Sequence, residues 1–167
     1  ENLEFALLAD GVEAKDLYAV LATEDGVDRA FAKLDEIKPH VVSFWSAGAQ
    51  PVQMLSDGEV AFTTAWNGRL TQLRQEGVPV ETIWNGGAIK PSYVGILKGT
   101  KHKKEAEQYV AFMIGDPVRG AEFAKLVAYP SMVKGLYDHI DPEAGREMPT
   151  HPDNIAGQFV VDAVFWA

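Results

Sequence analysis

A tryptophan and an arginine flank an Asn-Gly pair in the string Trp66-Asn67-Gly68-Arg69, where a strand-like run gives way to a helix-like run. In an open α/β sheet, ligands bind outside the carboxyl ends of the strands, and this pattern indicates such a place. Trp66 offers a flat apolar face, Gly68 lets a ligand approach the backbone, and Arg69 presents a planar fork suited to a carboxylate. The alternative left open is that Trp66 is core and Arg69 is a solvated helix start.

Other patterns do not predict catalysis or a metal centre. The Gly-x-Ser-x-Gly elbow of a serine nucleophile is absent, because Ser46 precedes Ala47-Gly48 without the first glycine. The strings Asp138-His139-Ile140-Asp141 and His151-Pro152-Asp153 lack the i,i+4 spacing of a dedicated metal site and read as solvated loops. We therefore expect no catalytic residue, no metal and no cofactor, and Ser46 remains only a ligand-binding candidate.

Composition excludes several classes of protein. The chain has 167 residues, a formal net charge of −9, 47% hydrophobic residues and no cysteine. That length and apolar content fit one globular domain rather than a disordered chain. An acidic chain does not favour nucleic acid as a partner, since the one basic cluster, residues 98–104, is short. No apolar run approaches the roughly twenty residues that cross a bilayer, and no leader sequence is expected at the start.

Helix-like and strand-like segments alternate along the first hundred residues. Asp25 is the expected cap of the second helix and Pro39 its end, and Asp116-Pro117 is expected to restart a long helix after Gly99. This order predicts an α/β fold with one open mixed sheet covered by helices on both faces. Helices are expected over 3–8, 25–38, 50–56 and 69–76, and strands over 41–45, 60–66, 80–84 and 92–97.

The last thirty residues differ in composition from the rest. Prolines and glycines are frequent between Asp138 and Pro152, which is typical of an extended surface segment. We therefore expect an α/β ligand-binding lobe over residues 1–137, and an extended tail with a closing segment packed on it over 138–167.

Short strings along nearly the whole chain share one collinear order with a known family. They are Leu3–Val12, Ala30–Pro39, Gly48–Pro51, Asp57–Val60, Ala65–Arg69, Lys98–Thr100, Tyr129–Ser131, Met148–Thr150, Pro152–Asn154 and Phe165–Ala167. In these strings the chain resembles the solute-binding proteins of ABC importers, of the spermidine/putrescine type. The collinear order is more specific than any single motif.

The resemblance implies one lobe of a type II periplasmic binding fold. In that family two α/β lobes close about a hinge on a solute, and this chain is similar to the C-terminal part. The implied partners are a small-molecule solute, an ABC permease in the membrane, and either the missing N-terminal lobe or another copy of the chain. The implied location is the periplasm, and the implied protein is not an enzyme.

Residue-by-residue comparison with the polyamine-binding members matches in part. Trp66 and Gly68 match the family's aromatic turn, and Tyr129 matches a ligand-facing tyrosine. Arg69 stands where those members carry a carboxylate that pairs with an ammonium. Glu1 corresponds to another ammonium-binding acid of the family.

Two further departures concern the strand that follows. The family's second carboxylate falls on Ser92, and its aromatic residue falls on Lys90. A polycation beside Arg69 and Lys90 would meet like charge, so we expect a small carboxylate-bearing or zwitterionic solute. The expected ligand-binding residues are Trp66, Asn67, Gly68, Arg69, Lys90, Ser92, Tyr129 and Ser46.

Two alternatives belong to other classes of protein. A small hydrolase-like or transferase-like α/β domain would use Arg69 to hold an anionic substrate, but it would need a convergent acid-base pair and a nucleophile. A pure interaction module is the third possibility, and it rests only on the missing lobe.

Overall fold

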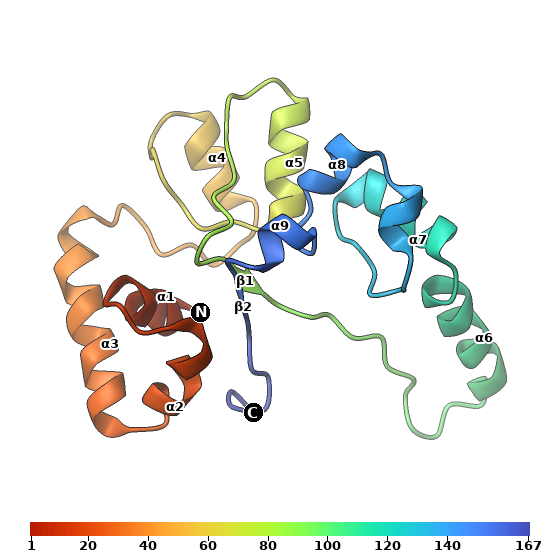
Figure 1. Cartoon of the computed structure of the whole chain (residues 1–167), viewed down its shortest axis with the longest axis horizontal. Helices are drawn as coiled ribbons and strands as arrows, with labels where there is room; N and C mark the ends of the chain where they lie inside the picture. Colours follow the sequence, from red (N-terminus) through yellow and green to blue (C-terminus); the bar gives the residue numbers. More distant parts are fainter.

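A computed structural model describes all 167 residues of the chain. Figure 1 shows three groups of helices around a short strand pair: α1, α2 and α3 on one side, α4 and α5 above, and α6, α7 and α8 on the other side. Strands β1 (Ala88–Ile89) and β2 (Phe159–Val160) lie where the groups meet. No helix is both long enough and apolar enough to span a bilayer.

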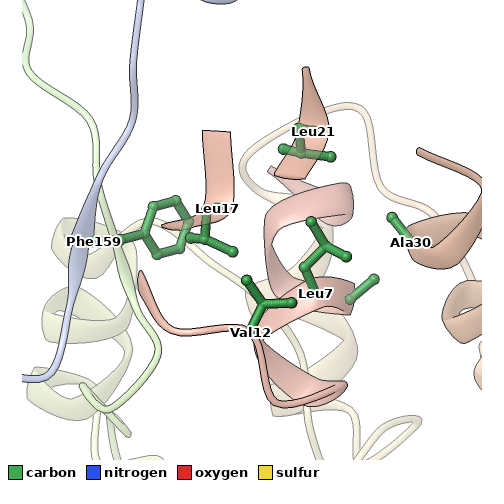
Figure 2. Close-up of a cluster of buried hydrophobic side chains, with 7 residues drawn as sticks. Leu7, Val12, Leu17, Leu21, Ala30 and Phe159 are labelled. Atoms are coloured by element: carbon green, nitrogen blue, oxygen red, sulfur yellow. The ribbon is translucent and has the colours of Figure 1, made fainter. Parts of the chain in front are cut away.

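The N-terminal cluster consists of three helices and one strand residue. Helices α1 (Asn2–Ala9), α2 (Leu17–Leu21) and α3 (Glu24–Ile37) pack together with Phe159 of β2, and a 3-10 turn (Ala14–Asp16) precedes α2. Figure 2 shows the buried apolar side chains of this cluster, among them Leu7, Leu17 and Phe159, and Leu7 and Leu17 are fully buried. The predicted helices at 3–8 and 25–38 are confirmed within a residue or two.

The start of α3 corrects one expectation. Thr23, not Asp25, is the N-cap, and its hydroxyl accepts a hydrogen bond from the Gly26 amide at 3.0 Å. Threonine in an extended conformation one residue before the helix satisfies an otherwise free N–H group. Helix α3 ends at Ile37, and Pro39 lies in a following 3-10 turn (Lys38–His40).

Two helix pairs follow the N-terminal cluster. Helix α4 (Gln50–Ser56) has the predicted bounds, and α5 (Asn67–Gln75) begins two residues before the predicted start. Helices α6 (Lys103–Ile114) and α7 (Pro117–Val127) are the predicted long helix and its restart. The Asp116 carboxylate caps α7 by accepting hydrogen bonds from two amides, at 2.8 and 3.2 Å, which hold the pKa of that carboxyl below its ordinary value.

The open α/β class is confirmed, but the four predicted strands are wrong. The sheet is one parallel pair, with Ala88 opposite Phe159 and Ile89 opposite Val160. Residues 41–45, 60–66, 80–84 and 92–97 form no ladder hydrogen bonds. A strand requires a neighbouring strand about 4.8 Å away, and these apolar segments have none, so their large side chains remain exposed.

The predicted extended tail over 138–152 is also wrong. It contains a 3-10 turn (Leu136–His139) and two short helices, α8 (Pro142–Arg146) and α9 (Pro152–Ile155). Asp141 caps α8 and His151 caps α9, so one residue from each of the two strings considered as metal sites serves as a helix cap. Met148 and Ile140 pack on Ala121 and Ala124 of α7 and form a second core cluster.

The chain exposes an unusual amount of surface. Its accessible area of 11568 Å² is about 3,400 Å² more than the roughly 8,100 Å² typical of a monomer of this mass. Helix α6 contains no buried residue. The two core clusters therefore account for only part of the apolar side chains that the sequence carries.

Candidate functional site

A cavity of about 370 Å³ lies at the carboxyl ends of the two paired strands. Lys90 directly follows β1 and Val161 directly follows β2. Parallel strands present these ends at one edge, the place where open α/β sheets bind ligands. We call this cavity the strand-end pocket, and its lining residues are Glu1, Lys90, Pro91, Val161, Ala163 and Trp166.

Backbone hydrogen bonds on both sides of the pairing set the position of the pocket. The Phe159 amide donates to the Gly87 carbonyl at 3.0 Å, and the Val161 amide donates to the Ile89 carbonyl at 2.9 Å. A Cβ on Gly87 would lie 2.9 Å from the Trp84 carbonyl oxygen, so the turn before β1 requires glycine. This pairing places Lys90 and Val161 on one rim.

Opposite charges meet in the strand-end pocket. The Lys90 ammonium lies 3.1 Å from a Glu1 carboxylate oxygen, with the two side chains 70% and 33% exposed. A solute that carries both an ammonium and a carboxylate matches this pair group by group. Val161, Pro91 and Trp166 supply apolar surface for the carbons between the two charged groups.

The predicted turn forms a second site, the aromatic turn, which consists of Trp45, Trp66, Asn67, Gly68 and Tyr129. The Trp66 ring meets Trp45 edge to face, with centroids 5.8 Å apart, and covers Gly48, where a Cβ would lie 2.3 Å from the ring. Trp66 is 52% exposed and is therefore not a core residue. Arg69 is exposed and forms no hydrogen bond or ion pair. This matches the part of the alternative interpretation in which Arg69 is a solvated residue at the start of a helix.

Asn67 and Gly68 join the start of α5 to the end of α7. The Asn67 side-chain amide donates to the Ala128 carbonyl at 2.6 Å, and Ala128 has a left-handed conformation with φ of 54°. A Cβ on Gly68 would lie 2.8 Å from the Tyr129 ring. The structure thus brings Trp66, Asn67, Gly68 and Tyr129 to one place, and Asn67 there has a packing role.

The remaining predicted residues lie apart from the aromatic turn. No hydrogen bond, ion pair or aromatic contact joins Lys90, Ser92 or Ser46 to it. Ser92 and Ser46 are exposed and make no side-chain hydrogen bond. Lys90 belongs to the strand-end pocket instead.

Sequence reasoning assigned no role to four residues of the strand-end pocket. Pro91 follows Lys90 directly, and Val161, Ala163 and Trp166 belong to the last nine residues, which the pairing of β2 with β1 brings to the pocket. The available signal was the family-like ending Phe165–Ala167, because it places an aromatic residue near the end of a segment that must return to the lobe.

No side-chain arrangement typical of a hydrolase is present. No serine or threonine hydroxyl is hydrogen-bonded to a histidine, and no group of three potential metal ligands converges. The Tyr137 hydroxyl instead lies 2.7 Å from the Thr150 hydroxyl, and burial raises the pKa of this phenol.

Comparison with known proteins identifies relatives along the whole chain. Residues 1–150 match the family described as bacterial extracellular solute-binding protein. The chain is 44% identical over 165 residues to a gamma-aminobutyric acid-binding protein of Pseudomonas aeruginosa, a match that covers 99% of this chain and 46% of that protein. It is 27% identical over 129 residues to a spermidine/putrescine-binding periplasmic protein of Salmonella typhimurium, covering 76% of this chain and 36% of that protein.

A solved structure has the same fold. An ABC transporter substrate-binding protein from Bradyrhizobium japonicum superposes with a TM-score of 0.84 and 35% identity, over 99% of this chain and 50% of that one. The chain spans about half the length of the proteins that it matches along its whole sequence.

Proposed function

The chain belongs to the bacterial extracellular solute-binding proteins, and from that membership we propose that it forms part of the binding site of an ABC importer's solute receptor. The proposed solute is a small ω-amino acid or a related zwitterion, not a polyamine. The protein would carry out no chemistry and would deliver the solute to a membrane permease from the extracytoplasmic side.

The observation that carries this proposal is the pairing of opposite charges in the strand-end pocket. Lys90 offers a cation for a carboxylate, and Glu1, 3.1 Å away, offers an anion for an ammonium. A zwitterion replaces this exposed ion pair with two charge-assisted contacts. A polyamine would satisfy Glu1 alone and would place an ammonium beside Lys90.

Arg69 supports the same chemistry at the aromatic turn. Its guanidinium has no partner in the chain. Trp66, whose ring is half exposed, precedes Arg69 by three positions in the sequence. A carboxylate would pair with this planar fork through two hydrogen bonds. A diamine would meet only a cation there.

The exposed apolar surface supports the proposal that this chain is part of a larger receptor. The relatives are about twice as long, and the chain shows about 3,400 Å² of surface beyond that of a typical monomer of its mass. We propose that a polypeptide equivalent to the other half of these relatives covers the segments 41–45, 60–66, 80–84 and 92–97. The alternative, a second copy of the chain, predicts a dimer in light scattering.

Matched four-carbon compounds test the choice of solute. We expect γ-aminobutyrate to shift backbone amide NMR signals of residues 88–90 and 160–166 at lower concentration than butanoate, butylamine or putrescine. Lys90→Met should weaken γ-aminobutyrate binding about tenfold or more. Lys134→Met, an exposed lysine without an ion pair, is the matched control and should leave binding unchanged. Putrescine binding that equals or exceeds γ-aminobutyrate binding would refute the zwitterion proposal.

The hydrolase or transferase alternative has a separate test. Family membership does not favour it, and it needs a nucleophile hydrogen-bonded to a general base, which neither site contains. Incubating the chain with esters and amides of γ-aminobutyrate should yield no product above the buffer rate. Product formation that Arg69→Met abolishes, and the matched control Arg146→Met does not, would favour the enzyme.

A further inference from the structure

The C-terminal segment, residues 159–167, forms one wall of the strand-end pocket. Three of the lining residues, Val161, Ala163 and Trp166, belong to it. Beyond β2 this segment has no regular secondary structure, so the pairing with β1 does not fix the position of Trp166. Contacts to other parts of the chain must therefore hold this wall.

Two side chains of the N-terminal cluster provide those contacts. The Trp166 indole N–H donates to Glu4 Oε1 at 2.9 Å, and the Tyr18 hydroxyl donates to the same oxygen at 3.2 Å. The Asp162 amide donates to the Tyr18 hydroxyl at 2.9 Å. Phe165 lies between the rings of Tyr18 and Trp166, with centroid distances of 5.2 and 5.1 Å. One carboxylate oxygen therefore holds Trp166 directly and holds the Asp162 end of the segment through the Tyr18 hydroxyl.

Glu4 is an unusual residue for this place. Its side chain is fully buried in α1, and its second oxygen, Oε2, accepts no hydrogen bond. The N-terminal ammonium lies 3.9 Å from Oε2, beyond hydrogen-bond distance. Burial of a carboxylate with one oxygen that lacks a hydrogen bond is unfavourable, and apolar side chains of similar volume often stabilise such positions. An apolar residue here would leave the indole N–H of Trp166 and the hydroxyl of Tyr18 without an acceptor. The hydrogen bonds that it accepts from Trp166 and Tyr18 therefore explain why a carboxylate occupies this buried position.

A glutamine at this position would be a poorer anchor than glutamate. Its amide oxygen would be a weaker acceptor for the indole than a carboxylate oxygen. The substitution Glu4→Gln thus conserves shape and weakens the hold of this oxygen on both Trp166 and Tyr18.

We propose that Glu4 is a positioning residue: through Trp166 and Tyr18 it fixes the C-terminal segment as a rigid wall of the strand-end pocket, and so sets the length of solute that the pocket accepts. The part that concerns solute length rests on the proposed function. Glu4 itself is not among the residues that line the pocket, so its effect on a solute passes through Trp166.

The first experiment needs no solute. In the chain labelled with ¹⁵N at its tryptophan indoles, Trp166→Phe assigns the Trp166 N–H signal among the four tryptophans. Glu4→Gln should move that signal upfield and raise its exchange with water roughly tenfold. The Trp45 signal, whose N–H donates to Thr64 at 3.0 Å, is the internal reference. Glu13→Gln, in an exposed pair with Lys15, is the matched control. An unchanged Trp166 signal in Glu4→Gln would overturn the anchor.

The second experiment measures selectivity for solute length. β-Alanine, γ-aminobutyrate and 5-aminopentanoate differ by single methylenes, and a fixed pocket separates such compounds by about tenfold or more. We expect Glu4→Gln to reduce the ratio of affinities between neighbouring amino acids in this series to about threefold or less. A loss of stability alone would not change this ratio. If Glu4→Gln does not fold, Tyr18→Phe removes the bond from the Asp162 amide and leaves the indole bond, and it should narrow the separation partly.

The possible outcomes separate the two proposals. A moved indole signal with unchanged length selectivity would overturn the role of Glu4 in specificity. If the native chain binds none of the three amino acids, the proposed function fails and the claim on solute length fails with it. The indole signal in the solute-free chain then still decides whether Glu4 positions Trp166.

Discussion

The N-terminal cluster and helix α6 both carry large apolar side chains on helices, yet only the cluster buries any of them fully. Leu7 of α1 is fully buried, whereas Tyr109, Phe112 and Ile114 of α6 are 62%, 56% and 53% exposed. Helix α6 is held by local forces, among them strong helix formers and a Lys103–Glu107 pair at 3.6 Å. The comparison shows that periodicity specifies a helix without specifying what it packs against.

The same contrast separates the two candidate sites. The strand-end pocket lies against the N-terminal cluster, and its wall is tied to α1 and α2 by hydrogen bonds. At the aromatic turn, Trp66 is half exposed, and Arg69 has no partner. The first site is therefore expected to keep its geometry in this chain alone, and the second site is expected to gain its final geometry when a larger receptor covers it.

The largest expected effect comes from two leucine-to-alanine substitutions, one of a buried and one of an exposed leucine. Leu7→Ala removes a fully buried side chain from the N-terminal cluster and should lower the free energy of unfolding by about 2–5 kcal/mol. Leu126→Ala, on α7, removes a side chain that is 82% exposed, so its effect should be within about 0.5 kcal/mol. Urea titration followed by circular dichroism measures both. Equal losses would mean that the two regions do not differ in packing.

A smaller effect is expected at the helix caps. Thr23→Ala removes the hydroxyl that caps α3 and should cost about 1 kcal/mol. His102→Ala changes the N-cap residue of α6, whose side chain makes no capping hydrogen bond, and should have almost no effect. Amide hydrogen exchange in the first turns of α3 and α6 resolves the two changes separately. Faster exchange at α6 than at α3 after these substitutions would contradict the assignment of the caps.

Local signals explain which elements the sequence predicted. Helix α4 has the expected bounds because its apolar spacing and its stop at Asp57-Gly58 are short-range features, and Gly58 has the left-handed φ of 71° that this stop requires. The predicted strand at 41–45 failed because strand formation depends on a distant partner that its own residues do not encode. Short-range chemistry was predicted well, and pairing between distant segments was not.

The candidate site divides in the same way. Trp66 and Gly68 lie together because a turn before a helix is a local feature, whereas the approach of Tyr129 to Gly68 joins segments about sixty residues apart. The neighbours of Lys90 could not be predicted, because they depend on the pairing of β1 with a strand about seventy residues later. The bond between Glu4 and Trp166 spans 162 positions, and a lone carboxylate in the apolar string Leu3–Leu8 was its only signal.

The smallest predicted effect concerns the surface of the N-terminal cluster at low pH. The Arg29 guanidinium, hydrogen-bonded to the Asp10 carboxylate, and the nearby Lys33 hold the pKa of Asp10 below its ordinary value of 3.8. Because the pKa is lower in the folded state, this contribution to stability is complete above about pH 4 and is lost as the pH falls through the folded-state value. Asp10→Asn should therefore flatten the acid side of the unfolding curve below about pH 4.

Asp35→Asn is the matched control for that measurement, because Asp35 is exposed on the same helix cluster and has no ion pair. Salt should reduce the difference between Asp10→Asn and the native chain, since exposed charges are screened. The α7 cap offers the contrasting case: Asp116 owes its lowered pKa chiefly to hydrogen bonds from backbone amides, which salt screens less than an exposed ion pair. Equal salt sensitivity at Asp10 and Asp116 would show that the N-terminal cluster and the start of α7 hold their surface carboxylates by the same interaction.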